Sequence, residues 1–152
     1  MTSPFDPTVY AQMSFSQKAS TESFPVPVGE HVCTIKEAKL SAWEKKDKSA
    51  GGLKVTFTLE CEDADGSIKE VTGREKANLR YEFILDMTED GNGLDFGKGK
   101  NIRLGRLQEA VGIQDGQPWS FDSFVGRRLI AKVKHEPYQE QLMAAVESVR
   151  AA

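Results

Sequence analysis

The chain has 152 residues, 39% of them hydrophobic and 28% charged, which is enough for one domain whose core needs no metal or disulfide. No apolar run approaches the about 20 residues that cross a bilayer, and the N-terminus lacks the basic-then-apolar order of a secretion signal. We therefore expect a cytoplasmic protein without membrane contact, and the net charge of −3 argues against indiscriminate binding of polyanions.

Residues 1–25 are rich in Ser, Thr, Pro and Gln, a composition typical of a flexible N-terminal tail. Residues 26–152 form the single predicted domain. The aromatic residues scattered through the tail suggest that parts of it dock on the domain or on a neighbouring subunit. These residues are Phe5, Tyr10, Phe15 and Phe24.

The first predicted strand contains apolar residues that change phase. Cys33 and Ile35 lie on one face, whereas Ala38 and Leu40 continue the apolar series one residue out of step. A β-bulge near Glu37 would return all four side chains to one buried face. It would also bend the strand sharply, as in small barrels.

We expect this strand over Val32–Leu40 and the next over Leu53–Cys61, whose clean alternation leaves Lys54 on the outer face. The loop 41–52 between them carries Trp43 among several cations. A large exposed aromatic among cations fits a ligand that is both flat and anionic. A single strand of nucleic acid offers bases that stack on the indole and phosphates that attract the lysines. These lysines are Lys45, Lys46 and Lys48.

The cysteines and histidines give no sign of a reactive or metal site. Cys33 and Cys61 fall on the apolar faces of the two strands and could be near neighbours, with buried free thiols as the expected state. His31 and His135 stand on predicted strands, and no CxxC or HxxxH spacing indicates zinc. We therefore expect no metal, no cofactor and no enzymatic activity.

After an Asp-Gly turn, a third element starts at Ser67, breaks near Gly73 and resumes over Leu79–Met87. Its alternation turns the aromatic residues inward and Arg80 outward. The glycine-rich stretch 88–100 has the wrong spacing for a P-loop and lacks the ligand pattern of a calcium loop. We interpret it as a solvated, flexible loop.

A helix is predicted over Ile102–Val111, with Asn101 as its cap and Gly112 at its end. An irregular linker follows over residues 114–124, in which Trp119 is expected to be half-buried. The order of strands, one helix and further strands predicts a mainly β fold (all-β or α+β). We expect a small barrel with one helix inserted before the last strands.

The next strand alternates apolar residues with a basic row, and the last segment is ambiguous. The apolar spacing after residue 141 slightly favours a helix, but a hairpin with a turn near 138–141 is the alternative. Tyr138 would be a second stacking residue. The basic row either contacts phosphates or only keeps the surface soluble, and it consists of Arg128, Lys132 and Lys134.

The stretches VPVGEHVCTIKEAKL, GGLKVTFTLEC, LGRLQEAVGI and FVGRRLIAKVKHEPYQ resemble a family of bacteriophage single-stranded DNA-binding proteins with an OB-fold. The resemblance covers roughly residues 25–140. It implies an OB barrel that coats single strands during phage replication or recombination in the host cytoplasm. It also implies that the Trp43–Lys54 loop and the Arg128–Lys134 strand face the DNA, and it favours a strand for the last segment.

We therefore predict a non-enzymatic, sequence-tolerant single-stranded DNA-binding protein. The alternative is an OB-like phage accessory or inhibitor module that binds a host protein and no DNA. Homodimerisation, contacts with replication or recombination proteins and the preference for DNA over RNA stay open. The predicted DNA-binding residues are Trp43, Lys45, Lys46, Lys48, Lys54, Arg80, Arg128, Lys132, Lys134 and Tyr138.

Overall fold

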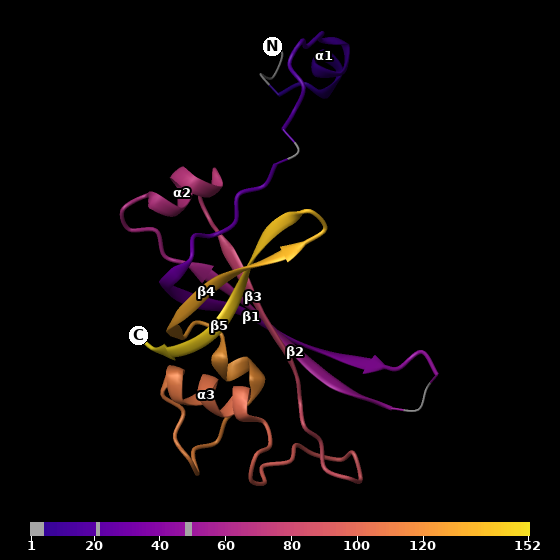
Figure 1. Ribbon diagram of the computed structural model, residues 1–152, viewed down its shortest axis with the longest axis vertical. Helices are drawn as coiled ribbons and strands as arrows, with labels where there is room; N and C mark the ends of the chain where they lie inside the picture. The colour runs from indigo at the N-terminus through magenta and orange to yellow at the C-terminus, as the bar shows by residue number, and fades with distance from the viewer. Residues whose placement is uncertain (1–4, 21, 48–49) are drawn as a thin grey trace.

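The computed structural model describes residues 5–20, 22–47 and 50–152, and five antiparallel strands form one sheet in the order β3-β2-β1-β4-β5. Figure 1 shows the strongly curved sheet with α3 packed below it and α1 standing apart at the N-terminal end. The elements are α1 (Pro7–Gln12), β1 (Gly29–Glu44), β2 (Gly51–Cys61), α2 (Ser67–Thr72), β3 (Asn78–Ile84), α3 (Ile102–Val111), the 3₁₀ turn η1 (Phe121–Phe124), β4 (Arg128–Tyr138) and β5 (Gln141–Ala151).

The predicted fold class is confirmed: the protein is mainly β, with one helix inserted before the last two strands. The hydrogen-bonded register joins each strand to its neighbour in the sheet, but among the described residues it includes no pair between the outer strands β3 and β5. Closure of the sheet into a barrel therefore stays a prediction.

The predicted bulge in β1 is confirmed. The register of β1 against β2 shifts between Ile35 and Glu37, so that Ile35 faces Leu59 and Ala38 faces Phe57. One extra residue on β1 keeps the apolar side chains on both sides of the shift directed toward the core. Both strands are longer than predicted, because β1 continues to Glu44 and β2 already begins at Gly51.

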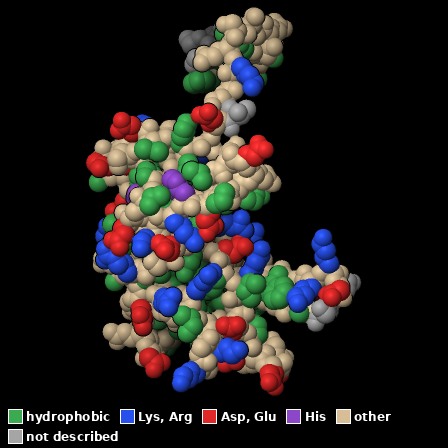
Figure 2. Space-filling model, viewed as in Figure 1, with side chains coloured by type: hydrophobic (Ala, Val, Ile, Leu, Met, Phe, Trp, Pro, Cys, Tyr) green, Lys and Arg blue, Asp and Glu red, His purple; other side chains and the backbone are tan. Residues whose placement is uncertain are grey.

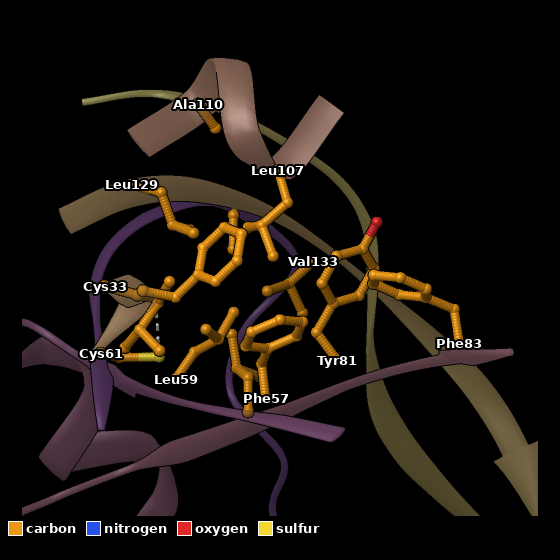
Figure 3. Close-up of a cluster of buried hydrophobic side chains, with 14 of the residues drawn as sticks. Cys33, Phe57, Leu59, Cys61, Tyr81, Phe83, Leu107, Ala110, Leu129 and Val133 are labelled. Carbon is orange, nitrogen blue, oxygen red and sulfur yellow. Dashed lines mark hydrogen bonds between the residues drawn. The ribbon is translucent and has the colours of Figure 1, made fainter. Parts of the chain in front are cut away.

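The core lies between the inner face of the sheet and α3 (Figure 3). Phe57 of β2 packs edge-on against Phe124 with 5.3 Å between ring centroids, and Leu107 of α3 reaches into the same buried cluster from the helix side. Full burial of such a side chain contributes about 1.5–3 kcal/mol. Cys33 and Cys61 are buried free thiols with their sulfur atoms 3.6 Å apart, as predicted.

The last segment is a strand, so the weak helical periodicity was misleading. Gln139 and Glu140 have φ values of 46° and 67°, the positive values that a two-residue hairpin turn needs to match strand twist. The register of β4 and β5 shifts after Lys132, which pairs Ala131 with Val149 and Val133 with Val146. Because of this bulge, Val146 and Val149 of β5 both face the core although they are three positions apart, and this spacing is also the spacing of a helix.

Asn101 stands at the start of α3, as predicted, but its side chain does not cap the helix. Its Oδ1 accepts a hydrogen bond from the Asp86 N–H at 2.8 Å, and its Nδ2 donates to the carbonyls of Asp86 and Asp95, each at 2.9 Å. The backbone N–H of Asn101 donates to Asp86 Oδ2 at 2.7 Å. Asn101 thus ties both ends of the glycine-rich loop to the end of β3.

We expect Asn101→Ala to destabilise the protein by about 2 kcal/mol, because it leaves a partly buried N–H and two partly buried carbonyls without their partner. Urea unfolding of the purified protein measures the change. The matched control is Asn92→Ala in the exposed part of the same loop, for which we expect a change within about 0.5 kcal/mol. Equal effects of the two substitutions would contradict the role given to Asn101.

Candidate nucleic-acid interface

Three predicted contact residues share the outer face of the β1–β2–β3 part of the sheet. Cross-strand pairing places Trp43 opposite Gly52, and Lys54 opposite Ile84. Arg80 lies four residue pairs further along, opposite Thr58. Since side chains alternate along a strand, these residues all point away from the core. The outer face of these strands is the surface that an OB-fold uses for oligonucleotides.

Trp43 lies on the hairpin arm, the part of β1 and β2 that extends beyond the core (Figure 1). Its half-buried ring lies over Gly52, since a Cβ built there would stand 3.1–3.6 Å from three indole atoms. The indole Nε1 is covered and has no hydrogen-bond partner among the described residues. A buried indole N–H usually has a partner, so this ring position carries an unsatisfied donor.

The tip of the arm carries exposed cations. Lys45 and Lys46 are both exposed, and the backbone N–H of Lys45 donates to the Ala50 carbonyl at 2.9 Å to close the loop. Lys48, also predicted as a contact, lies outside the described residues. Lys45 and Lys46 follow directly after the end of β1, two and three residues beyond Trp43.

Lys54 and Arg80 share one carboxylate, that of Glu82. Glu82 accepts from Thr56 Oγ1 at 2.6 Å, lies 3.5 Å from Lys54 Nζ, and forms an ion pair with Arg80. The Thr56 hydrogen bond, followed by that of Arg80, lowers the pKa of Glu82 to about 2. Two cations and one permanently ionised carboxylate leave this cluster with one net positive charge.

The basic row on β4 is present, but each member has an acidic partner. Arg128 binds Glu62 through two hydrogen bonds of 2.8 and 3.0 Å. Lys132 lies 3.4 Å from Glu147 and Lys134 lies 2.9 Å from Glu136; the four β4 and β5 partners are exposed or nearly so. The row is therefore close to neutral, and Figure 2 shows basic and acidic side chains interspersed over the visible face. Clustering of like charges in the sequence does not produce a uniformly basic surface there.

Tyr138 is 60% exposed at the end of β4. The β4–β5 turn and the β1–β2 arm project from different parts of the sheet (Figure 1). Tyr138 and Trp43 are thus two separate aromatic positions. Trp119, which was expected to be half-buried, packs edge-on against Phe121 and Phe124 with centroid distances of 5.3 and 5.8 Å.

A groove joins several of these residues and adds one that the sequence did not single out as a contact. One hollow of about 380 Å³ lies between β3 and β5 and is lined by Arg80, Lys134 and Arg103. A second, of about 520 Å³, is lined by Lys54, Ile84 and again Arg103. Because the hollows share Arg103 and Glu82, we treat them as one surface, the Arg103 groove.

Arg103 is exposed in the first turn of α3 and has no ion pair among the described residues. The Glu136 hydrogen bond raises the pKa of Lys134, while the positive charge of Arg103 acts in the opposite direction. Arg103 is thus close enough to Lys134 for their charges to interact. Helical periodicity placed it on the polar face of α3, but only the packing of α3 beside β5 brings it to the groove.

The remaining polar groups have structural roles. His31 and His135 each bond through Nε2 to a carbonyl of the segment before β1, Pro27 at 2.7 Å and Val26 at 2.8 Å. Within the described part of the chain, no three His, Cys, Asp or Glu residues are placed to hold a metal ion. Nor does any described helix combine the length and apolar character needed to cross a membrane.

The comparisons with known proteins add no relative: no family model matches the chain, and a search of curated proteins finds no match. The resemblance to phage single-stranded DNA-binding proteins therefore stays a prediction from the sequence.

We expect Glu82 to remain ionised down to about pH 2. Because its pKa is lowered in the folded state, the stabilisation it provides is complete above its ordinary pKa of 4.5 and is lost as the pH falls toward 2. Thr56→Val removes the strongest hydrogen bond to Glu82 and should move its pKa toward 4.5. NMR titration of the Glu82 carboxyl carbon measures both values.

Thr58→Val on the same strand and face is the control, and it should leave the Glu82 titration unchanged. A Glu82 pKa near 4.5 in the unmodified protein would show that the Thr56–Glu82–Arg80 cluster does not form in solution.

Proposed function

We propose that this protein binds single-stranded DNA without sequence preference through the outer face of β1–β2–β3 and the Arg103 groove. The observation that carries the proposal is the position of Trp43. Its indole lies over Gly52 on the same face as Lys54, beside the exposed cations of the arm tip. Stacking on an aromatic contributes about 1–3 kcal/mol per base and is indifferent to base identity.

The distribution of the candidate residues supports an OB-type mode of binding. OB-folds bind oligonucleotides with the face of strands 2 and 3 and with the loops after strands 1 and 4. Lys45 and Lys46 lie in the loop after β1, Lys54 and Arg80 lie on β2 and β3, and Tyr138 lies at the end of β4. The resemblance stated above supports a phage protein that coats single strands in replication or recombination.

The ion pairs decide which cations contribute most. Exposed ion pairs contribute about 0–1 kcal/mol each, so a phosphate can replace the carboxylate partner at modest cost. Within the described residues, Lys45, Lys46 and Arg103 form no ion pair with a carboxylate, so a phosphate has no partner to displace there. We assign the main phosphate contacts to these three and to the Lys54–Arg80 pair. Arg128, Lys132 and Lys134 contribute less.

One observation favours the alternative, a module that binds a host protein. Ile84, in the wall of the Arg103 groove, is 59% exposed, and the neighbouring Lys54 is paired with Glu82. An exposed apolar residue surrounded by ion pairs also suits a protein partner. The DNA titration below separates the two proposals.

Trp43→Ala should weaken binding to oligo-dT by roughly 5- to 150-fold, the equivalent of about 1–3 kcal/mol for one lost stack. Trp119→Phe is the control, because it keeps the aromatic packing around residue 119. It also leaves Trp43 as the single tryptophan, so the fluorescence of this variant reports on Trp43 alone. In this background we expect oligo-dT to quench the fluorescence, and added salt to reverse the quenching. A flat titration at low salt would remove the DNA proposal and favour the host-protein alternative.

Arg103→Gln should reduce the salt dependence of oligo-dT binding. Each phosphate neutralised on a single strand contributes about −0.7 to the slope of log Kobs against log salt concentration, so the slope should become less negative by about that amount. Lys69→Gln on α2 is the matched control, since Lys69 pairs with Glu75 at 2.8 Å and lies outside the groove. An unchanged slope for Arg103→Gln would place the DNA elsewhere.

A further inference from the structure

The N-terminal arm, residues 7–20, presents apolar side chains that its own domain does not cover. No residue of α1 is buried, and α1 stands away from the sheet (Figure 1). Tyr10 and Met13 are each 48% exposed and Phe15 is 69% exposed. A helix of six residues is far too short to be stable in water by itself, so α1 needs a surface to pack on.

The domain has a groove with both apolar and polar side chains in its lining at the point where this arm joins it. Val26 is buried, its carbonyl bonds His135, and Ser23 Oγ donates to Gln141 Oε1 at 2.8 Å. Beside this anchored segment lies a hollow of about 230 Å³, lined by Leu79, Leu142 and Met143 among others. Leu142 is 54% and Met143 48% exposed. We call this hollow the Met143 groove.

We propose that the arm of one copy docks in the Met143 groove of a second copy, with one aromatic side chain of the arm, Tyr10 or Phe15, inserted. The volume of about 230 Å³ is enough for one ring, because a cavity of about 150 Å³ holds a benzene ring. The charges also fit: Asp6 is the only charged residue between Phe5 and Phe15, and Arg74 and Arg80 line the groove.

The geometry of the connection favours a neighbour over the same chain. Residues 16–20 lead away from the groove (Figure 1), and five extended residues reach up to about 18 Å. The arm therefore points away from its own groove, and docking there would require the chain to turn back on itself. The Met143 groove adjoins the Arg103 groove, because Arg80 and Met143 line both, so a docked arm and a DNA strand would meet at Arg80.

The test is self-association without nucleic acid, so it stands apart from the DNA proposal. Sedimentation equilibrium compares the unmodified chain with an arm variant, Tyr10→Ser with Phe15→Ser, and a groove variant, Leu142→Ser with Met143→Ser. A control variant, Ile102→Ser with Val125→Ser, removes two apolar residues that are 49% and 46% exposed elsewhere on the domain. Circular dichroism confirms that each variant is folded.

We expect the unmodified and control chains to self-associate, with an average mass that rises as the protein concentration increases from low to high micromolar. The arm and groove variants should associate at least tenfold more weakly. An equimolar mixture of these two variants should form dimers, because it contains one intact arm and one intact groove. If the groove variant does not fold, the arm variant is mixed with the unmodified chain instead. The arm variant keeps an intact groove but has no arm to dock, so it should end the assemblies of the unmodified chain and lower their average mass.

Three results would overturn the proposal. The unmodified chain stays monomeric at all concentrations, the arm variant associates like the control, or the mixture of folded variants stays monomeric. If the unmodified chain is monomeric and its arm variant moves more slowly in sedimentation velocity, the arm docks on its own domain.

Discussion

The bulge in β1 decides which way the hairpin arm presents its side chains. Cys33 and Ile35 point to the core, and without the extra residue every second residue after them would do so as well, Trp43 included. The register shift between Ile35 and Glu37 turns Ala38 inward and Trp43 outward. The position of the candidate stacking residue is therefore a consequence of one backbone irregularity ten residues before the tip of the arm.

In its outward position, the ring of Trp43 packs on the backbone of the neighbouring strand, which a residue with a side chain at that place would prevent. Gly52 is its cross-strand partner, and the missing Cβ leaves room for the indole to lie on the sheet. The same arrangement covers Nε1 without providing an acceptor. An unsatisfied buried donor costs about 1–3 kcal/mol, so movement of the ring toward a ligand would be favoured by the hydrogen bond that Nε1 regains.

The sequence predicted those features that depend on local pattern. The phase change in β1, the clean alternation of β2 and the limits of α3 follow from the positions of apolar residues along one segment. The strand β5 was harder, because its bulge pairs Val133 with Val146 and Ala131 with Val149 and so produces a helical spacing. The bonds of Asn101 were also missed, since its partners are supplied by the preceding loop.

Several ion pairs of the candidate site could not be predicted from the local sequence pattern, because they join residues that are far apart in the chain. Arg128 finds Glu62 at a separation of 66 residues in the chain, and Arg103 reaches the groove only because α3 packs beside β5. Long-range pairing converts an apparently basic row into a nearly neutral one and shifts the candidate phosphate contacts toward the arm tip and Arg103. Local charge, rather than the net charge of −3, governs the encounter with a phosphate backbone.

The most direct test of DNA stacking on Trp43 is the NMR signal of the two indole N–H groups during titration with oligo-dT. The protein has two tryptophans, and the Trp119→Phe variant assigns their signals. We expect the Trp43 Nε1–H signal to move strongly, together with backbone signals near Lys54 and Arg103, while the Trp119 signal stays in place. An unmoved Trp43 signal at saturating oligo-dT would show that DNA does not stack on Trp43.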